Sequence, residues 1–270
     1  MKRAYRDVVM ATVVGTFLVH GAPAGAAEMV ANEDGVYGYE DTPMLPWINY
    51  RVHDNRRPKP RHVEAKPSTT PAPADAVVLF GGTGMDQWQV AEGWQVADGA
   101  LVAGKRAMRT RQSFGDCQIH LEFMVPDVES PNFSDRGNNG VGLMGLYEIQ
   151  IFDSHPMHEK KLYADGQCAA IYGETPPLVN ACRRPGEWQS FDIVFIAPVF
   201  EGDKLVSPAY VTVHHNGVLV HHHEPIRGPV RWRGIAPYKP HPPKLPLVLM
   251  SHGSEVRFRN IWVRDLDPQP

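Results

Sequence analysis

The sequence has almost no charge imbalance and few aromatic residues. It contains 27 Lys and Arg against 30 Asp and Glu, a formal net charge of -3, and 9% aromatic residues. A surface without excess positive charge does not favour nucleic acid or an anionic membrane as a partner. We therefore expect an uncharged partner, such as a small molecule or an oligosaccharide, and no nucleic acid.

Cysteine is scarce. The chain has three, Cys117, Cys168 and Cys182, and no C-x-x-C motif, so a thiolate metal site is not expected. In an oxidising compartment three cysteines allow at most one intramolecular disulfide. Cys168 and Cys182 flank a turn-rich segment with two prolines, so we predict a disulfide between them and a buried, reduced Cys117.

Long apolar runs are absent except near the start of the chain. There, residues 8–19 follow the basic residues Lys2, Arg3 and Arg6 and precede Ala24-Gly25-Ala26. This pattern is typical of a secretory signal over residues 1–26, and a run of about 12 residues is too short to span a bilayer. An uncleaved anchor or a buried helix is the alternative. We expect a periplasmic or secreted protein without a membrane span after removal of the signal.

Residues 27–75 contain seven prolines, which interrupt every run that could form a helix or strand. The part at 66–74, KPSTTPAPA, has the composition of a semi-rigid or disordered linker. Four aromatic residues precede it: Tyr37, Tyr39, Trp47 and Tyr50. These are too many for a solvated tail, so we expect the arm to pack on the main domain.

The sequence after residue 26 also lacks helical periodicity. Short alternating runs recur instead between turn signals, which predicts one all-β sandwich domain over residues 76–267. The expected strands are 77–80, 94–96, 100–103, 119–125, 141–152, 169–172, 190–195, 210–215, 218–223, 247–250 and 256–263.

The clearest local prediction is a β-hairpin over residues 210–223. Asn216-Gly217 supplies the two positive-φ positions of a type I′ turn. Such a turn places Val213 opposite Val220 and Thr212 opposite His221. The histidines of this ribbon would lie on both of its faces, and a metal site there is the less favoured alternative because no carboxylate lies close by.

The strand Tyr147-Glu-Ile-Gln-Ile-Phe-Asp153 carries the predicted chemistry. Alternation puts Glu148 and Gln150 on one face, and a one-residue bulge after Gln150 would bring Asp153 to the same face. Ionisable groups on a central strand are costly unless water or a ligand satisfies them. We therefore predict that Glu148 and Asp153 are catalytic; an edge strand with a solvated polar face is the alternative.

A second predicted strand, 119–125, carries Glu122 on its polar face. If this strand neighbours the first, Glu122 joins Glu148 and Asp153, and crowding raises the pKa of one carboxyl. The alternative is that Glu122 is paired with an arginine such as Arg109 or Arg111.

Further polar and aromatic candidates lie in turns. His252 follows the apolar run 247–250, so it is expected at a strand end, as a base, an acid or a ligand, or as a simple surface residue. Asn139 lies before the strand of Glu148. Three aromatic residues are candidates for stacking on a sugar ring: Tyr172, Trp188 and Trp232.

Seven ordered segments resemble the 3-keto-disaccharide hydrolase domain family over residues 77–266. They are Asn139-Gly140-Val141, 147–153, 166–172, Gly186-Glu-Trp-Gln189, Asn216-Gly217, His252-Gly253 and 256–263. The resemblance implies a concanavalin A-like jelly roll whose concave sheet holds a sugar. It also implies cleavage of glycosides oxidised at C3, in an exported setting.

The resemblance further implies an analogy to laminarinase-type glycosidases of similar fold, whose catalytic strand has the pattern Glu-x-Asp-x-x-Glu. Here the strand has Glu148-x-Gln150-x-x-Asp153, which argues against a retaining double displacement by two glutamates. A ketone at C3 instead acidifies the C2 hydrogen, so a base can start an elimination that hydration completes. Glu148 and Asp153 are then expected to transfer protons, with His252, Arg259 or a divalent metal at the oxyanion.

The complete set of predicted site residues has two parts. The catalytic candidates are Glu148, Asp153, Glu122 and His252, and the substrate-binding candidates are Gln150, Asn139, Tyr172, Trp188 and Arg259. No residue is assigned to the candidate metal. Two non-catalytic alternatives stay open: a carbohydrate-binding module, and a structural envelope protein whose arm, residues 28–61, docks a partner.

Overall fold

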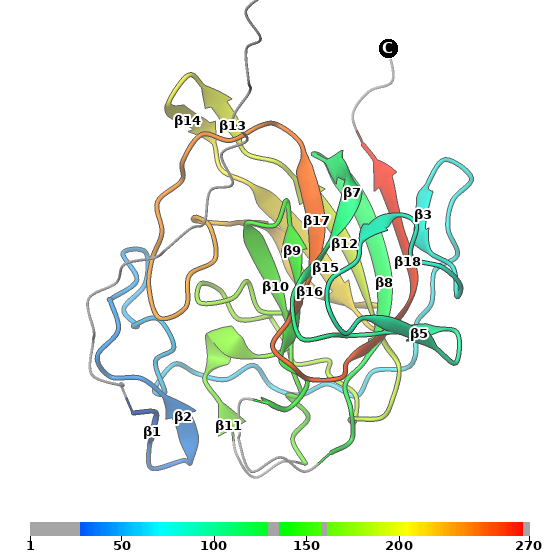
Figure 1. Cartoon of the computed structure of the whole chain (residues 1–270). Helices are drawn as coiled ribbons and strands as arrows, with labels where there is room; N and C mark the ends of the chain where they lie inside the picture. Colours follow the sequence, from blue (N-terminus) through cyan, green and yellow to red (C-terminus); the bar gives the residue numbers. More distant parts are fainter. Residues whose placement is uncertain (1–27, 129–134, 158–160, 267–270) are drawn as a thin grey trace, which may run out of the picture.

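The computed structural model describes residues 28–128, 135–157 and 161–266, so the predicted signal lies outside the described residues. Two antiparallel sheets pack face to face (Figure 1), which confirms the all-β sandwich. The five-stranded sheet has the order β10 (Tyr147–Ile151), β9 (Asn139–Leu143), β17 (Leu245–Ser251), β7 (Met108–Phe114), β4 (Trp88–Gln89).

The larger sheet has eight strands. Its order is β16 (Val218–Pro225), β15 (Tyr210–His215), β12 (Gln189–Ile196), β8 (Cys117–Met124), β18 (Arg257–Asp265), β6 (Ala100–Val102), β5 (Gln95–Ala97), and β3 (Val77–Phe80) also pairs with β18. The smaller elements are β1 (Val30–Ala31), β2 (Val36–Gly38) and β11 (Lys161–Leu162) in one sheet, β13 (Val199–Glu201) with β14 (Lys204–Ser207), and a 3-10 helix, Ala164–Gly166.

The core lies between the two large sheets and follows the two-residue period of the strands. Three residues of β8 and three of β10 are at most 1% exposed: Ile119, Leu121, Phe123, Tyr147, Ile149 and Ile151. Burial of one such side chain stabilises the fold by about 1.5–3 kcal/mol. The alternate residues Glu122 and Glu148 consequently lie on the outer faces of two different sheets.

The hairpin prediction is confirmed in its turn but not in its pairing. Asn216 and Gly217 have φ of 53° and 76° between β15 and β16. Val213 pairs with His221, however, because the register shifts between Val213 and His214. The shift turns His221 inward, where its Nε2 lies 2.7 Å from the carbonyl oxygen of Ala169.

The run predicted as one strand at 141–152 forms two strands. Met144 and Gly145, with φ of 54° and 67°, reverse the chain between β9 and β10. The pairing from Tyr147 with Leu143 to Ile151 with Asn139 is continuous, so the bulge predicted after Gln150 is absent. β10 is also the last strand of its sheet rather than a central one.

The free edge of β10 is covered by residues 169–172, which were predicted as a strand. The amides of Ala169 and Tyr172 donate to the carbonyl oxygens of Gln150 and Glu148, and the Gln150 amide donates to the Ala170 carbonyl. Ile171 forms only isolated bridges. These hydrogen bonds satisfy the backbone groups at the free edge of β10. Residues 169–172 also border the polar face of the strand.

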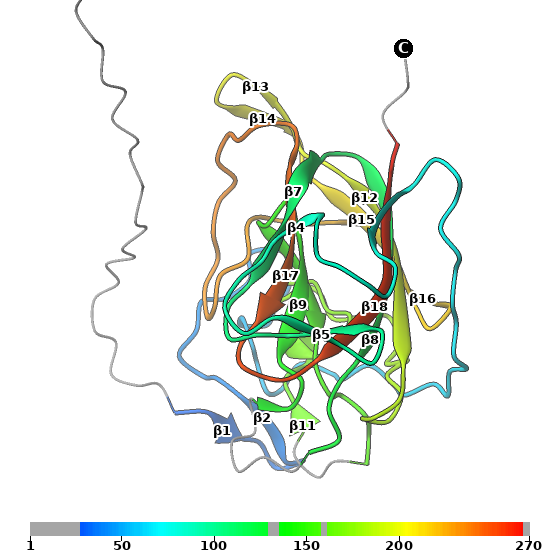
Figure 2. The ribbon, with the colours of Figure 1, turned by 45° about the vertical axis from the view of Figure 1, so that its right-hand side comes forward.

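The arm packs on the sandwich, as its aromatic content predicts. Tyr39, Leu45 and Val52 are buried, and β2 pairs with β11. The linker at 66–74 is no free spacer: the Thr70 carbonyl accepts hydrogen bonds from the Trp262 indole at 3.0 Å and the Asn260 amide at 3.2 Å. Figure 2 shows this part of the chain beside β18 and β16, on the outer side of the larger sheet.

The described residues hold no helix with the length and apolar content that a membrane crossing requires.

Candidate active site

A cleft of about 600 Å³ lies against the polar face of β10, between the five-stranded sheet, the arm and the loop that carries Trp232. Glu148, Gln150, Tyr172 and His252 line it. Its volume falls in the range of roughly 300–1,000 Å³ typical of small-molecule sites. Four of the predicted catalytic and substrate-binding residues, together with the stacking candidate Trp232, therefore meet in one cavity.

Glu148 lies deep in this cleft and is 6% exposed. None of the described residues that line the cleft is a lysine or arginine. Burial without a compensating cation raises the pKa of Glu148 to about 8. The carboxyl is therefore poised to exchange a proton near neutral pH.

Gly140, on β9 beside Glu148, leaves room for the carboxyl. A Cβ atom at this position would lie 2.3 Å from Glu148 Oε1. With its amide nitrogen directed at β9, Gln150 donates to Glu148 Oε1 at 3.1 Å and to the Asn139 carbonyl at 2.7 Å. The carboxyl thus has one defined hydrogen-bond donor.

Asn139 does not contact the cleft itself. Its side-chain nitrogen donates to the Ser254 carbonyl at 3.3 Å, which ties β9 to the loop of His252. Asn138, the preceding residue, lines the cleft instead. Alternation along the strand explains this one-residue correction.

Two phenols face the same cavity. The hydroxyls of Tyr163 and Tyr172 lie 3.3 Å apart, and burial raises the pKa of each well above its usual value. Both therefore stay protonated at neutral pH and can donate hydrogen bonds. The ring of His53, from the arm, stacks on Tyr163 with centroids 4.0 Å apart and bonds to Asp165 below it.

His252 lies at the rim of the cleft, where solvent reaches it. Desolvation by its neighbours lowers its pKa, so the ring is neutral at pH 7. A neutral imidazole can accept a proton at one nitrogen and donate from the other.

Asp153 does not join Glu148, and the predicted pair is wrong. Phe152 takes the next position on the cleft face, since no bulge follows Gln150. Asp153 faces a second cavity of about 310 Å³, where Arg136 Nε lies 3.8 Å from its Oδ2. The two carboxyls therefore lie in different cavities, and the predicted proton exchange between them cannot take place directly.

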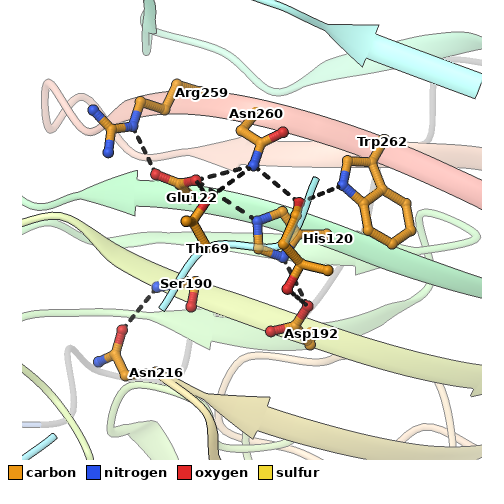
Figure 3. Close-up of polar contacts among 10 residues, drawn as sticks. Thr69, His120, Glu122, Ser190, Asp192, Asn216, Arg259, Asn260 and Trp262 are labelled. Carbon is orange, nitrogen blue, oxygen red and sulfur yellow. Dashed lines mark hydrogen bonds and ion pairs between the residues drawn. The ribbon is translucent and has the colours of Figure 1, made fainter. Parts of the chain in front are cut away.

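Glu122 belongs to another cluster, on the outer face of the larger sheet (Figure 3). Arg259 Nε donates to Glu122 Oε2 at 2.7 Å, and Thr69 and Asn260 donate to Oε1 at 2.5 and 3.0 Å. Burial alone would raise the pKa of Glu122, but the His120 imidazole, whose Nε2 lies 3.8 Å from Oε1, and these hydrogen bonds lower it to about 2. The partner is an arginine, as the alternative proposed, but neither Arg109 nor Arg111.

Arg259 and Trp188 also lie outside the cleft of Glu148, as members of the Glu122 cluster. The Arg259 guanidinium lies 4.0 Å from the centre of the Trp188 ring while it bonds to Glu122. His120 completes the cluster, with Nδ1 2.7 Å from Asp192 Oδ1 (Figure 3). These residues join β8, β12, β18 and the linker and have a structural role.

The predicted disulfide is absent. Cys168 and Cys182 are buried thiols whose side chains contact one another without a bond. The Cys182 thiol donates to the carbonyl of Arg183 at 3.5 Å. Burial raises the pKa of Cys168 well above its usual value, which keeps it in the unreactive thiol form.

Within the described ranges, no group of three or more His, Cys, Asp and Glu side chains is arranged to hold an ion. The candidate divalent metal therefore has no ligand set there. Among the described residues that line the cleft, only Glu148 and His252 carry a carboxylate or an imidazole. These two groups do not fit a resident metal, which is usually held by three or four protein ligands.

Sequence reasoning missed the contribution of the arm to the cleft. Tyr39 and Met29 line it together with Tyr163. The aromatic content of the arm indicated packing, but nothing in its sequence indicated which face it covers.

The chain matches the family described as "3-keto-alpha-glucoside-1,2-lyase-like domain" over residues 75–264. Among solved structures, it is similar to a "putative glycosyl hydrolase" from Parabacteroides distasonis, with 38% identity over 73% of this chain and 86% of that chain and a TM-score of 0.68.

Two further structures of the same description and organism share only the fold. One has 23% identity over 71% of this chain and 99% of that chain, with a TM-score of 0.54. The other has 21% identity over 72% and 94%, with a TM-score of 0.52. No curated protein matches the chain significantly.

The match over residues 75–264 covers well over half of the sequence and agrees with the resemblance of the seven segments. The chain therefore belongs to the 3-keto-alpha-glucoside-1,2-lyase-like domain family.

Proposed function

We propose that this protein cleaves glycosides that carry a ketone at C3 of the reacting sugar, by proton abstraction at C2, elimination and hydration. The family match and the similar structure at 38% identity support a hydrolase or lyase that acts on glycosides. The finer proposal rests on the buried carboxyl of Glu148, whose pKa is raised, in a cleft whose other described lining residues carry no carboxylate.

The carboxyl count favours this chemistry over double displacement. A retaining glycosidase needs two carboxyl groups about 5–5.5 Å apart, one as nucleophile and one as acid and base. Among the described residues that line the cleft, Glu148 alone carries a carboxylate, because Asp153 and Glu122 lie elsewhere. An elimination next to a ketone needs one strong base and no glycosyl-enzyme.

In the proposed route ionised Glu148 removes the C2 proton, and the C–H electron pair forms an enolate with the C3 oxygen. Collapse of the enolate restores the C3 ketone, forms the C1–C2 double bond and expels the C1 oxygen, which takes up a proton. Water then adds its oxygen to C1 and a proton to C2. A carboxylate whose pKa is raised to about 8 is a stronger base than an ordinary glutamate.

The remaining polar groups fit the other two tasks. The protonated phenols of Tyr163 and Tyr172 can donate hydrogen bonds to the enolate oxygen, where fixed donors stabilise developing charge. His252, at the rim, is the candidate donor to the departing oxygen, because that side of the cleft opens to solvent.

The test is turnover of a 3-keto disaccharide against the same disaccharide without the ketone. We expect cleavage of the first alone, and a loss of about 10²- to 10⁴-fold in kcat for Glu148→Gln with binding retained. The profile of kcat/KM should rise with pH through about 8, the pKa of Glu148, because the base acts when ionised. Equal turnover of both sugars would contradict the mechanism, and binding without turnover would indicate a carbohydrate-binding module.

We also propose that the protein is exported, on the pattern of residues 1–26. The amino-terminal sequence of protein recovered from the periplasm or medium tests this. A start near residue 27 supports export, and an intact Met1 in the cytoplasm contradicts it.

A further inference from the structure

Trp232 stands out at the mouth of the cleft. It lines the same cavity as Glu148 but is 65% exposed, whereas Glu148 is 6% exposed. The cleft therefore has a deep polar floor and an aromatic rim. Single exposed aromatics are common on protein surfaces, so exposure alone does not distinguish Trp232 from an ordinary surface residue.

Unlike an ordinary surface residue, Trp232 lies on a loop that the arm holds in place. Arg233 Nη2 donates to both carboxylate oxygens of Asp41 at 2.7 Å. Its guanidinium lies 4.6 Å from the centre of the Tyr39 ring and 5.4 Å from the centre of the Trp232 ring. The loop is thus fixed to the arm by the ion pair with Asp41 and the cation–π contact with Tyr39, and the Trp232 ring lies against the same guanidinium.

The backbone of the loop is also fixed. Arg233 has a φ of 52°, an uncommon conformation for a residue with a side chain, and the Val230 amide donates to the Leu146 carbonyl at 2.7 Å. An exposed tryptophan on such a braced loop is preorganised to receive a ligand, because little conformational freedom remains to be lost on binding.

We propose that Trp232 forms a subsite for a second sugar ring, the leaving saccharide of the substrate, and that Tyr39, Asp41 and Arg233 are its positioning residues. The inference rests on the proposed function and names its substrate class: disaccharides and longer glycosides rather than glycosides of small alcohols. The apolar C–H face of a pyranose packs on an indole ring, as other apolar groups pack on aromatic faces. With the oxidised ring at Glu148 on the floor, the leaving saccharide extends towards the rim.

The arm makes this subsite an addition to the domain. Tyr39 and Asp41 lie outside residues 75–264, which match the family, whereas Glu148 and Trp232 lie within them. The matched domain supplies the floor and the tryptophan, and the arm supplies the brace. Substrate size is therefore controlled separately from the chemistry.

The experiment compares a 3-keto disaccharide with methyl 3-keto-glucoside, which lacks the second ring. Trp232→Ala should lower kcat/KM for the disaccharide about tenfold and leave the methyl glycoside unchanged, and Trp232→Phe should restore most of the loss. Asp41→Asn should reduce the same preference several-fold. Asp98→Asn is the matched control, since it breaks a comparable exposed pair with Arg257 at 3.2 Å, away from the cleft.

Equal losses on both substrates, or no loss on the disaccharide, overturn the subsite. A second readout separates this result from failure of the proposed function: calorimetric binding of both sugars to the Glu148→Gln protein with and without Trp232→Ala. Selective weakening of disaccharide binding supports the subsite even if neither sugar is cleaved. Unchanged disaccharide binding rejects it even if both sugars are cleaved.

Discussion

At the scale of single residues, Glu148 and Glu122 are two buried glutamates whose surroundings act in opposite directions. Glu148 has one amide donor and no cation among the described residues lining its cleft, and its pKa is raised to about 8. Glu122 has an arginine and several donors, and its pKa is lowered to about 2. At neutral pH, Glu148 therefore lowers the stability of the fold, whereas Glu122 raises it.

Replacement of Glu148 by glutamine should therefore raise stability. The folded protein holds the Glu148 proton up to about pH 8, whereas the unfolded chain releases it near the ordinary value of about 4.5. Stability of the original protein falls as pH rises through this window, by up to about 1.4 kcal/mol per pKa unit. Glu148→Gln should match the original protein at pH 4 and exceed it by at least about 1 kcal/mol at pH 8.5 in urea denaturation. A less stable variant at pH 8.5 would indicate that the carboxylate serves the fold.

Glu122→Gln should have the opposite effect. Loss of the charge-assisted bond from Arg259 should lower stability at pH 7 by roughly 1–3 kcal/mol. The difference from the original protein should shrink as pH falls from about 4.5 to 2, where Glu122 takes up a proton in the folded state as well. Turnover per folded molecule should stay unchanged. A selective loss of kcat would return Glu122 to the mechanism.

At the scale of elements, the hairpin of β9 and β10 positions the base through a glycine. Gly140→Ala would place a methyl group 2.3 Å from Glu148 Oε1 and force the carboxyl aside. Misplacement by about 1 Å can lower kcat about 10²-fold, with the fold retained. Gly81→Ala is the control, since a Cβ there meets only ordinary contact at 3.5 Å. Similar kcat values for both variants would show that the carboxyl position is not critical.

Alternation along strands made much of this element predictable. It gave the apolar and polar faces of β10, and Asn-Gly gave the turn between β15 and β16. Strand β7 escaped prediction because MRTRQSF has large apolar residues only at its ends, with Thr110 buried between them. Bulges were the weakest point: none follows Gln150, whereas β18 shifts register near Asn260, whose φ is 45°.

Sheet membership could not be derived from alternation at all. A polar face on β8 resembles a polar face on β10 in sequence, although Glu122 and Glu148 lie on different sheets. The partners of Glu122 come from residues 53 and 137 positions away, Thr69 and Arg259. Local patterns carry no signal for pairs at such separations, so three predicted site residues, Glu122, Trp188 and Arg259, were misplaced together.

At the scale of the whole molecule, the arm is an integral part of the domain. Its sequence indicated only that it packs on the domain surface. Its buried side chains, such as Leu45 and Val52, each stabilise the fold by about 1.5–3 kcal/mol. A chain that begins at Asp75 should therefore melt at least about 5 °C below one that begins at Glu28, measured by circular dichroism. Equal melting temperatures would mean that the arm is a tether without structural effect.

The linker has a consequence for the order in which the protein folds. Thr70 bonds to Asp192 and Trp262, 122 and 192 positions further along the chain, so its binding surface does not exist until β12 and β18 have paired with β8. Closing such distant contacts is slow, because chain entropy is lost before they form. The arm and the linker should thus be the last parts of the described chain to fold into place. Until they do, the nascent sandwich has an open cleft and an uncovered sheet face, the state in which it is most vulnerable to aggregation.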